Sequence, residues 1–233
     1  MTGVVNINKP IGRSSHFAVA VIRRITKIKK VGHTGTLDPM ATGVLPICIG
    51  REATKLSQLI MDSPKEYKAV LKLGITTTTQ DGEGEITSEK EVASTKEEVE
   101  NAVNSFVGEI TQIPPMYSAI KINGKKLYEL ARKGVEVERE PRKVTIHYIN
   151  ILNVDMEEKE AEIVIGCSKG TYIRTLCNDI GEKLGCGGYM KSLVRTKCGG
   201  FDIKDSITLE EFEELFKSGK AEEVIVPPQE IKK

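Results

Sequence analysis

Residues 32–46 read Gly32-His33-Thr34-Gly35-Thr36-Leu37-Asp38-Pro39-Met40-Ala41-Thr42-Gly43-Val44-Leu45-Pro46. The glycines and prolines of this stretch rule out a regular helix and indicate a loop held at defined backbone angles. Pro39 biases Asp38 toward an extended conformation that presents its carboxylate. A single carboxylate on a stiff loop is a poor metal site and a poor two-carboxylate hydrolase, but it is a reasonable nucleophile. Alternatively, Asp38 only makes an Asx-type turn before the proline.

The composition is that of an ordinary globular protein. The 233 residues are 39% hydrophobic and 29% charged, which is enough apolar material for a substantial core. No apolar run approaches the ~20 residues that a membrane helix needs, and the N-terminus leads into a strand rather than a signal peptide. We therefore expect a cytoplasmic protein with no membrane partner.

The cysteines and histidines do not form a metal-binding pattern. The number of cysteines is odd, no C-x-x-C pair occurs, and the three histidines are far apart in the sequence. We expect the cysteines to be reduced and mostly buried: they are Cys48, Cys167, Cys177, Cys186 and Cys198. Sequence motifs for ATP, dinucleotide and zinc sites are also missing. An enzyme built on Asp38 is therefore expected to use neither a metal nor a cofactor.

Basic and acidic residues are segregated along the chain, although the net charge is only +1. One basic run precedes the Asp38 loop and consists of Arg23, Arg24, Lys27, Lys29 and Lys30. A second basic run consists of Lys121, Lys125, Lys126, Arg132, Lys133, Arg139, Arg142 and Lys143. Acidic residues gather in segments 81–100, 155–162 and 210–223. This pattern favours a positive face for phosphates; the alternative is solvated surface charge.

Hydrophobic periodicity and capping signals predict an α+β fold. We expect helices after Ser14 and Gly170, after the capping boxes that begin at Thr95 and Thr208, and over residues 52–60 and 127–132. The predicted strands are 4–7, 44–49, 65–73, 117–122, 144–154, 161–167, 193–196 and 201–203. Residues 74–84 are expected to be a loop and Asn123-Gly124 a turn. Together these elements predict a single domain around a largely antiparallel mixed sheet with flanking helices.

Several separate stretches carry a family resemblance along most of the chain. They are Asn8-Lys9-Pro10-Ile11-Gly12, residues 32–39 and 41–46, Lys65-Glu66-Tyr67, Gln112-Ile113-Pro114-Pro115-Met116-Tyr117-Ser118-Ala119, Gly170-Thr171-Tyr172-Ile173-Arg174-Thr175-Leu176 and Leu193-Val194-Arg195-Thr196. In this set and order, the chain resembles the TruB family of tRNA pseudouridine-55 synthases. The family often carries an aspartate in the loop after the Tyr67 strand, where this chain has Thr78.

The resemblance implies a pseudouridine-synthase-like catalytic domain over residues 1–204. Residues 205–233 would form a C-terminal helix and tail. Many bacterial members continue into a small RNA-binding PUA domain, which we expect to be absent here because the sequence stops soon after Val226-Pro227-Pro228-Gln229.

The resemblance also implies the reaction and the partner. A uridine in the T-loop of tRNA would be flipped out and converted to pseudouridine, the base being detached from its ribose and rejoined through carbon. This isomerisation has no net redox change, which agrees with the missing cofactor motifs. The partner would be the T-arm stem-loop of tRNA, and we expect a monomer without an obligate protein partner.

Two charged residues carry the chemistry that the resemblance implies. Asp38 would be the nucleophile that attacks either the ribose C1′ or the uracil C6. Arg174 would pair with Asp38 and keep it ionised and oriented. From the residues alone, Tyr172 and Arg174 lie in the first turn of their helix, off the buried stripe, and Arg174 could equally be an ordinary surface cation.

Four further residues would contact the RNA if the resemblance holds. Tyr67 would stack on the extruded uracil, and Tyr172 would contact the same nucleotide. Leu193 would form a wall of the pocket, and His33 would fill the stack that the flipped base leaves. Without the family match, each of these residues could be an ordinary core or edge residue.

Two other functions compete with this interpretation. The first is a non-catalytic tRNA-binding or chaperone module that keeps the basic face and the aromatic residues. The second is a catalytic subunit that depends on a guide RNA. The intact set of Asp38, Tyr67, Tyr172 and Arg174 argues against the first, and the short spacing between the N-terminal turn and the Asp38 loop argues against the second.

Overall fold

The computed structural model describes residues 1–118, 120–122, 124–131 and 133–231, without the side chains of residues 121, 122, 125 and 126. Several predictions therefore lie wholly or partly outside the described residues: the strand 117–122, the turn at Asn123-Gly124, the end of the helix 127–132, and the basic side chains of Lys121, Lys125, Lys126 and Arg132. The described chain divides into two compact units. We call residues 1–68 with 193–233 the terminal unit and residues 69–192 the central unit. The predicted domain boundary at residue 204 stays a prediction.

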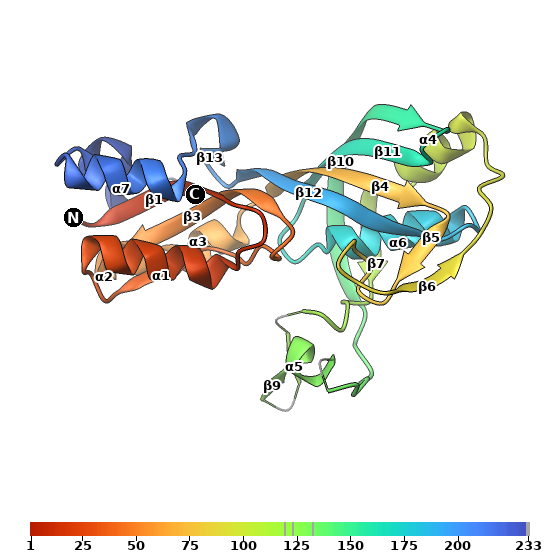
Figure 1. The fold of residues 1–233 in the computed structure, drawn as a ribbon, viewed down its shortest axis with the longest axis horizontal. Helices are drawn as coiled ribbons and strands as arrows, with labels where there is room; N and C mark the ends of the chain where they lie inside the picture. The colour runs from red at the N-terminus through yellow and green to blue at the C-terminus, as the bar shows by residue number, and fades with distance from the viewer. Residues whose placement is uncertain (119, 123, 132, 232–233) are drawn as a thin grey trace. The chain divides into compact units, whose positions relative to one another are not determined.

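The terminal unit is built on a sheet with the strand order β14-β1-β3-β12, of which Figure 1 labels β1, β3 and β12. These strands are β14 (Ile225–Val226), β1 (Gly3–Lys9), β3 (Thr42–Ile49) and β12 (Gly188–Cys198), which starts in the central unit. Two short strands extend the sheet: β2 (Val31–His33) pairs with β3, and β13 (Phe201–Asp202) pairs with β12. The β3–β12 pairing is parallel, whereas β1, β2, β13 and β14 pair antiparallel.

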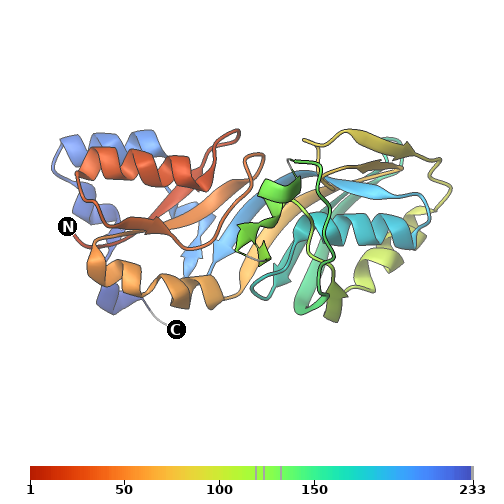
Figure 2. The ribbon, with the colours of Figure 1, turned by 90° about the horizontal axis from the view of Figure 1, so that it is seen from below.

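Helices cover this sheet on both sides (Figure 2). On one side α1 (Ser15–Thr26) contacts α7 (Leu209–Lys217), and the predicted caps are confirmed: Ser14 caps α1 and the Thr208–Glu211 box caps α7. On the other side α2 (Arg51–Lys55) and α3 (Ser57–Asp62) pack over a cluster of buried apolar residues. The prediction of one helix over residues 52–60 was wrong, because the helix is interrupted at Leu56.

The central unit is built on a sheet with the strand order β4-β11-β10-β7. These strands are β4 (Lys65–Leu73), which starts in the terminal unit, β11 (Glu160–Cys167), β10 (Arg142–Asp155) and β7 (Gly108–Gln112). The β10–β11 hairpin confirms the two predicted long strands. The strand β7 was not predicted. Two helices, α4 (Lys96–Asn104) and α6 (Ile173–Lys183), contact each other, and α4 contacts β10. The α+β class with a mixed, largely antiparallel sheet is therefore confirmed, and all five cysteines are buried and free as expected.

The segment 74–84 is not the plain loop that the sequence predicts. Residues of β5 (Ile75–Thr77) pair with β6 (Ile86–Glu89), and Thr78 closes the turn by donating its N–H to the Glu85 carbonyl at 2.9 Å. These strands are short, and β6 is mostly exposed, so they lack the apolar alternation by which a strand is recognised.

The remaining elements are short. They are β8 (Lys121–Ile122), β9 (Lys125–Lys126), α5 (Leu127–Ala131) and the 3₁₀ turns Ile203–Asp205, Ala221–Val224 and Pro228–Glu230. In Figure 1, α5 and β9 stand apart from the sheet of the central unit. Within the described ranges, no helix is both long and apolar enough to cross a membrane.

Candidate active site

The loop that carries Asp38 connects β2 to β3 in the terminal unit, and Asp38 is partly buried. Its backbone carbonyl accepts a hydrogen bond from the Ala41 N–H at 3.1 Å, which makes a tight turn around Pro39. The Pro39 carbonyl accepts from the Gly12 N–H at 2.8 Å. The loop is thus tied to the turn that follows β1.

Two buried polar side chains anchor the same loop. Lys9 is fully buried, and its Nζ donates to the carbonyls of Pro10 at 2.8 Å and Pro39 at 3.2 Å. Ser15 Oγ accepts from the Leu37 N–H at 2.9 Å and donates to the Leu37 carbonyl at 3.1 Å. These bonds fix the backbone on both sides of Asp38, so its carboxylate can move only by rotation of its own side chain.

His33 stands at the start of the loop, at the end of β2. Its Nδ1 accepts a hydrogen bond from the Gly35 N–H at 3.3 Å, and its ring meets the His16 ring edge-on with 5.1 Å between centroids. Burial, with smaller contributions from the charges of His16 and Arg195, lowers the pKa of His33 to about 4. The imidazole is therefore neutral near pH 7, with its proton on Nε2, because Nδ1 acts as an acceptor.

Tyr67 and Leu193 also belong to the terminal unit. Tyr67 lies on β4 next to Glu66, whose carboxylate accepts from Thr196 Oγ1 at 2.8 Å and pairs with Lys197 at 3.2 Å. Since side chains alternate along a strand, Tyr67 lies on the face of β4 opposite Glu66. Tyr67 is partly buried, and Leu193, at the point where β12 enters this unit, is 7% exposed.

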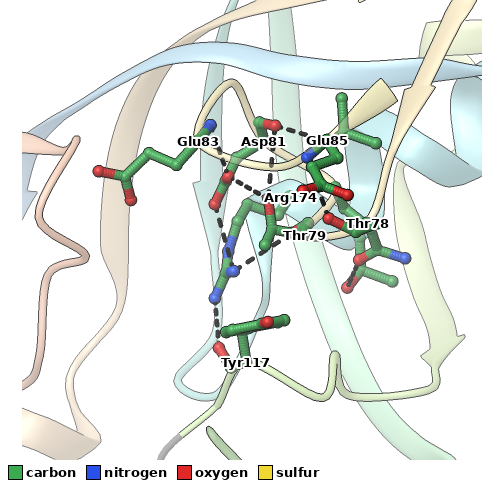
Figure 3. Close-up of polar contacts among 10 residues, drawn as sticks. Thr78, Thr79, Asp81, Glu83, Glu85, Tyr117 and Arg174 are labelled. Atoms are coloured by element: carbon green, nitrogen blue, oxygen red, sulfur yellow. Dashed lines mark hydrogen bonds and ion pairs between the residues drawn. The ribbon is translucent and has the colours of Figure 1, made fainter. Parts of the chain in front are cut away.

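Arg174 belongs to the central unit and lies in the first turn of α6, as predicted. The expectation that it lies off the buried stripe was wrong, because the residue is only 5% exposed. Its guanidinium donates to Asp81 Oδ2 at 3.3 Å and to the carbonyls of Thr79 at 3.3 Å and Tyr117 at 2.7 Å (Figure 3). A cation at the N-terminal end of a helix is disfavoured by the helix dipole. Arg174 can be buried there because the Asp81 carboxylate and two carbonyl oxygens accept hydrogen bonds from its guanidinium.

Asp81 is the residue that the sequence interpretation missed. It is 3% exposed, and its Oδ1 accepts from Thr79 Oγ1 at 2.5 Å and from the Glu83 N–H at 3.1 Å. The loop after β4 therefore does contain an acid, three residues beyond Thr78. The available signal was an aspartate just before Gly82 in a polar turn, a position at which Asp is usually explained by the turn alone.

Tyr172 is the N-cap residue of α6 rather than a residue of its first turn. The buried Gln112 holds its backbone from both sides: Gln112 Nε2 donates to the Tyr172 carbonyl at 3.1 Å, and the Tyr172 N–H donates to Gln112 Oε1 at 3.0 Å. This two-point contact fixes the start of α6, and with it the two residues Tyr172 and Arg174.

The predicted site residues are thus shared between the two units. The terminal unit holds His33, Asp38, Tyr67 and Leu193, with the first two on one loop. The central unit holds the remaining two at the start of α6. The described residues contain no group of three or more His, Cys, Asp or Glu side chains placed to hold a metal ion. What the chain offers chemically is a carboxylate on an anchored loop and a buried, oriented guanidinium.

Two family models together match residues 23–230. Residues 23–173 match the model of the N-terminal domain of the TruB family pseudouridylate synthases. Residues 174–230 match the model of the tRNA pseudouridylate synthase B C-terminal domain.

Two of the most similar relatives are each called tRNA pseudouridine synthase B. The chain is 55% identical over 227 residues to the protein of Alkaliphilus oremlandii, and the match covers 97% of this chain and 74% of that protein. It is 54% identical over 230 residues to the protein of Clostridium tetani, and the match covers 98% of this chain and 77% of that protein.

Two solved structures share the fold. A chain of a Cbf5-Nop10-Gar1 complex is 31% identical, with a TM-score of 0.76, and the match covers 97% of this chain and 60% of that one. A chain of an H/ACA RNP bound to a substrate RNA is 28% identical, with a TM-score of 0.72, and the match covers 97% and 59%. The predicted family and enzyme class are confirmed. The chain belongs to the TruB family of pseudouridylate synthases.

Proposed function

We propose that this protein converts uridine to pseudouridine at position 55, in the T-loop of tRNA, with Asp38 as the nucleophile. The observation that carries the proposal is the Asp38 loop itself: buried Lys9 and Ser15 hold its backbone on both sides of a single partly buried carboxylate. Such an arrangement suits a group that must reach one atom in one direction.

The reaction balances without a cofactor. The bond between uracil N1 and ribose C1′ breaks, and a bond between C5 and C1′ forms, while C5 gives up a proton and N1 gains one. Asp38 attacks C1′ or C6 to make the covalent intermediate that allows the base to turn. A neighbouring cation would favour the ionised form of a partly buried carboxylate, and the pairing of Asp38 with Arg174 that the resemblance implies stays a prediction.

The RNA contacts follow the same interpretation. Tyr67 stacks on the extruded uracil, Tyr172 contacts the same nucleotide, and Leu193 forms a wall of the pocket. Neutral His33 fills the gap in the base stack; a neutral ring can stack there without attracting a phosphate. We further propose that the protein works as a monomer in the cytoplasm and that the T-arm stem-loop is enough for recognition.

The decisive variant is Asp38→Asn, which keeps the shape of the side chain and removes the reactive anion. Pseudouridine formation in an unmodified T-arm stem-loop, measured in single turnover, should fall on the order of 10⁴-fold or more. Binding should survive because phosphate contacts supply most of the affinity. Asp205→Asn, an equal charge change at an exposed position, is the control and should keep the wild-type rate. A near-normal rate for Asp38→Asn would remove Asp38 from the mechanism.

The same assay separates the competing functions. A non-catalytic tRNA-binding module would bind the stem-loop and leave its uridine unchanged. A guide-dependent subunit would act only when a guide RNA is added. The identities of 54–55% to the tRNA pseudouridine synthase B relatives, against 28–31% to those complexes, support a synthase that acts alone.

A further inference from the structure

Arg195 is the largest fully buried side chain in the described part of the molecule, at 1% exposure on β12. Its Nε donates to the Val44 carbonyl at 2.7 Å, and one terminal nitrogen donates to the Gly35 carbonyl at 3.3 Å. Gly35 precedes Asp38 and Val44 follows it. One guanidinium therefore ties together the two limbs of the loop that presents the carboxylate.

The backbone of Arg195 is seated against the same loop. Arg195 pairs in parallel register with Gly43, which has φ +98°. A Cβ built on Gly43 would lie 2.3 Å from the Arg195 carbonyl oxygen, so only glycine fits there. Strand pairing and side-chain hydrogen bonds thus place residue 195 by two independent sets of contacts.

Arg195 and His33 hold the two peptide groups that flank the Cα atom of Gly35. The Gly35 carbonyl accepts from Arg195, while the Gly35 N–H donates to His33 Nδ1. That second bond requires an unprotonated Nδ1. The charged groups that act on His33 are His16 from α1 and Arg195 from β12, and both oppose its protonation, as burial does. The charge of Arg195 therefore adds to burial and to His16 in keeping Nδ1 unprotonated, so that it can accept from the Gly35 N–H.

A buried guanidinium is a costly way to fill space. Among the described residues, Arg195 has no ion pair with a carboxylate, and its guanidinium donates to the backbone carbonyls of Val44 and Gly35. An apolar side chain of similar length would pack without the cost of removing a charge from water. The forked donors and the charge together point to a role in shaping the loop.

We propose that Arg195 is a positioning residue for the reaction at Asp38: its guanidinium fixes both limbs of the loop, so that the carboxylate is presented in one geometry. The inference rests on the proposed function. It assigns Arg195 no contact with RNA, only an effect through the loop.

The test compares Arg195→Met, which keeps the length and loses charge and donors, with Arg195→Lys, which keeps the charge and loses the fork. Arg195→Met should slow single-turnover pseudouridine formation by roughly 10²-fold, the effect of a small misplacement of a reacting group. Its affinity for the stem-loop should stay near that of wild type. Arg195→Lys should recover part of the rate. By NMR titration, the pKa of His33 should rise in the Met variant and stay near its wild-type value in the Lys variant.

Thr26→Val is the matched control, because it removes a buried hydroxyl that donates to the Ile22 carbonyl within α1, away from the loop. It should lower stability without changing the rate or the His33 pKa. The proposal is overturned if Arg195→Met reacts at the wild-type rate, or if the control slows as much. If the Met variant does not fold, a wild-type rate for Arg195→Lys overturns it equally. A wild-type protein that makes no pseudouridine would refute the proposed function instead, while the His33 titration would still test the hold of Arg195 on the loop.

Discussion

Asp81→Asn tests the polar pocket that orients Arg174. The two side chains are only 4% and 6% exposed, and their charged atoms lie 3.3 Å apart. Removing one partner of a buried ion pair costs about 3–5 kcal/mol, because the other charge is left buried. Asn keeps Oδ1 as the acceptor for Thr79 and Glu83, and Arg174 keeps two carbonyl acceptors. We therefore expect a loss near 3 kcal/mol, the lower end of that range.

For a chain of this length, such a loss lowers Tm by about 6–12 °C. The assay is thermal unfolding followed by circular dichroism and calorimetry. Glu85→Gln is the matched control, since it makes the same charge change at an exposed position in the same turn, and it should change Tm very little. If Asp81→Asn melts within a degree or two of wild type, the pair does not hold the guanidinium, and the reasoning about this pocket is wrong.

Three further predictions concern the terminal unit. The pKa of His33 is about 4 in the folded chain against 6.5 for a free imidazole, so between these pH values the unfolded chain binds more protons than the folded chain. The free energy of unfolding should therefore fall as the pH falls through this range. Urea unfolding at pH 7 and pH 4.5 should show a smaller fall for His33→Gln than for the wild type. Gly43→Ala should destabilise by about 3 kcal/mol or more in urea unfolding, because its Cβ meets the Arg195 backbone, whereas Gly12→Ala, with open space around it, should cost about 1 kcal/mol. Binding of tRNA should weaken steeply with salt, and Ala substitutions at the exposed lysines of residues 27–30 should flatten that slope in filter-binding measurements; an unchanged slope would contradict the basic-face model.

The features that could be predicted from the sequence are those that depend on residues close together in the chain. The caps at Ser14, Thr95 and Thr208 act within three residues of the helix starts, so the sequence determined those starts by itself. The β10–β11 hairpin joins two segments that are neighbours in the sequence and in which apolar and polar residues alternate, so both strands could be predicted from the sequence. The same holds for the Asp38 loop, whose glycines and prolines restrict the backbone wherever the rest of the chain goes.

What only the tertiary structure decided are contacts between segments far apart in sequence. Arg174 and Asp81 are 93 residues apart, and Arg195 is 160 residues from Gly35, so no local pattern links them. The burial of Arg174 depends on which polar groups surround the start of α6, and the short strands β5 and β6 depend on each other for their hydrogen bonds. Pairing of this kind is set by strand register and packing of the whole sheet, whereas the sequence of one segment specifies only its own conformational preference.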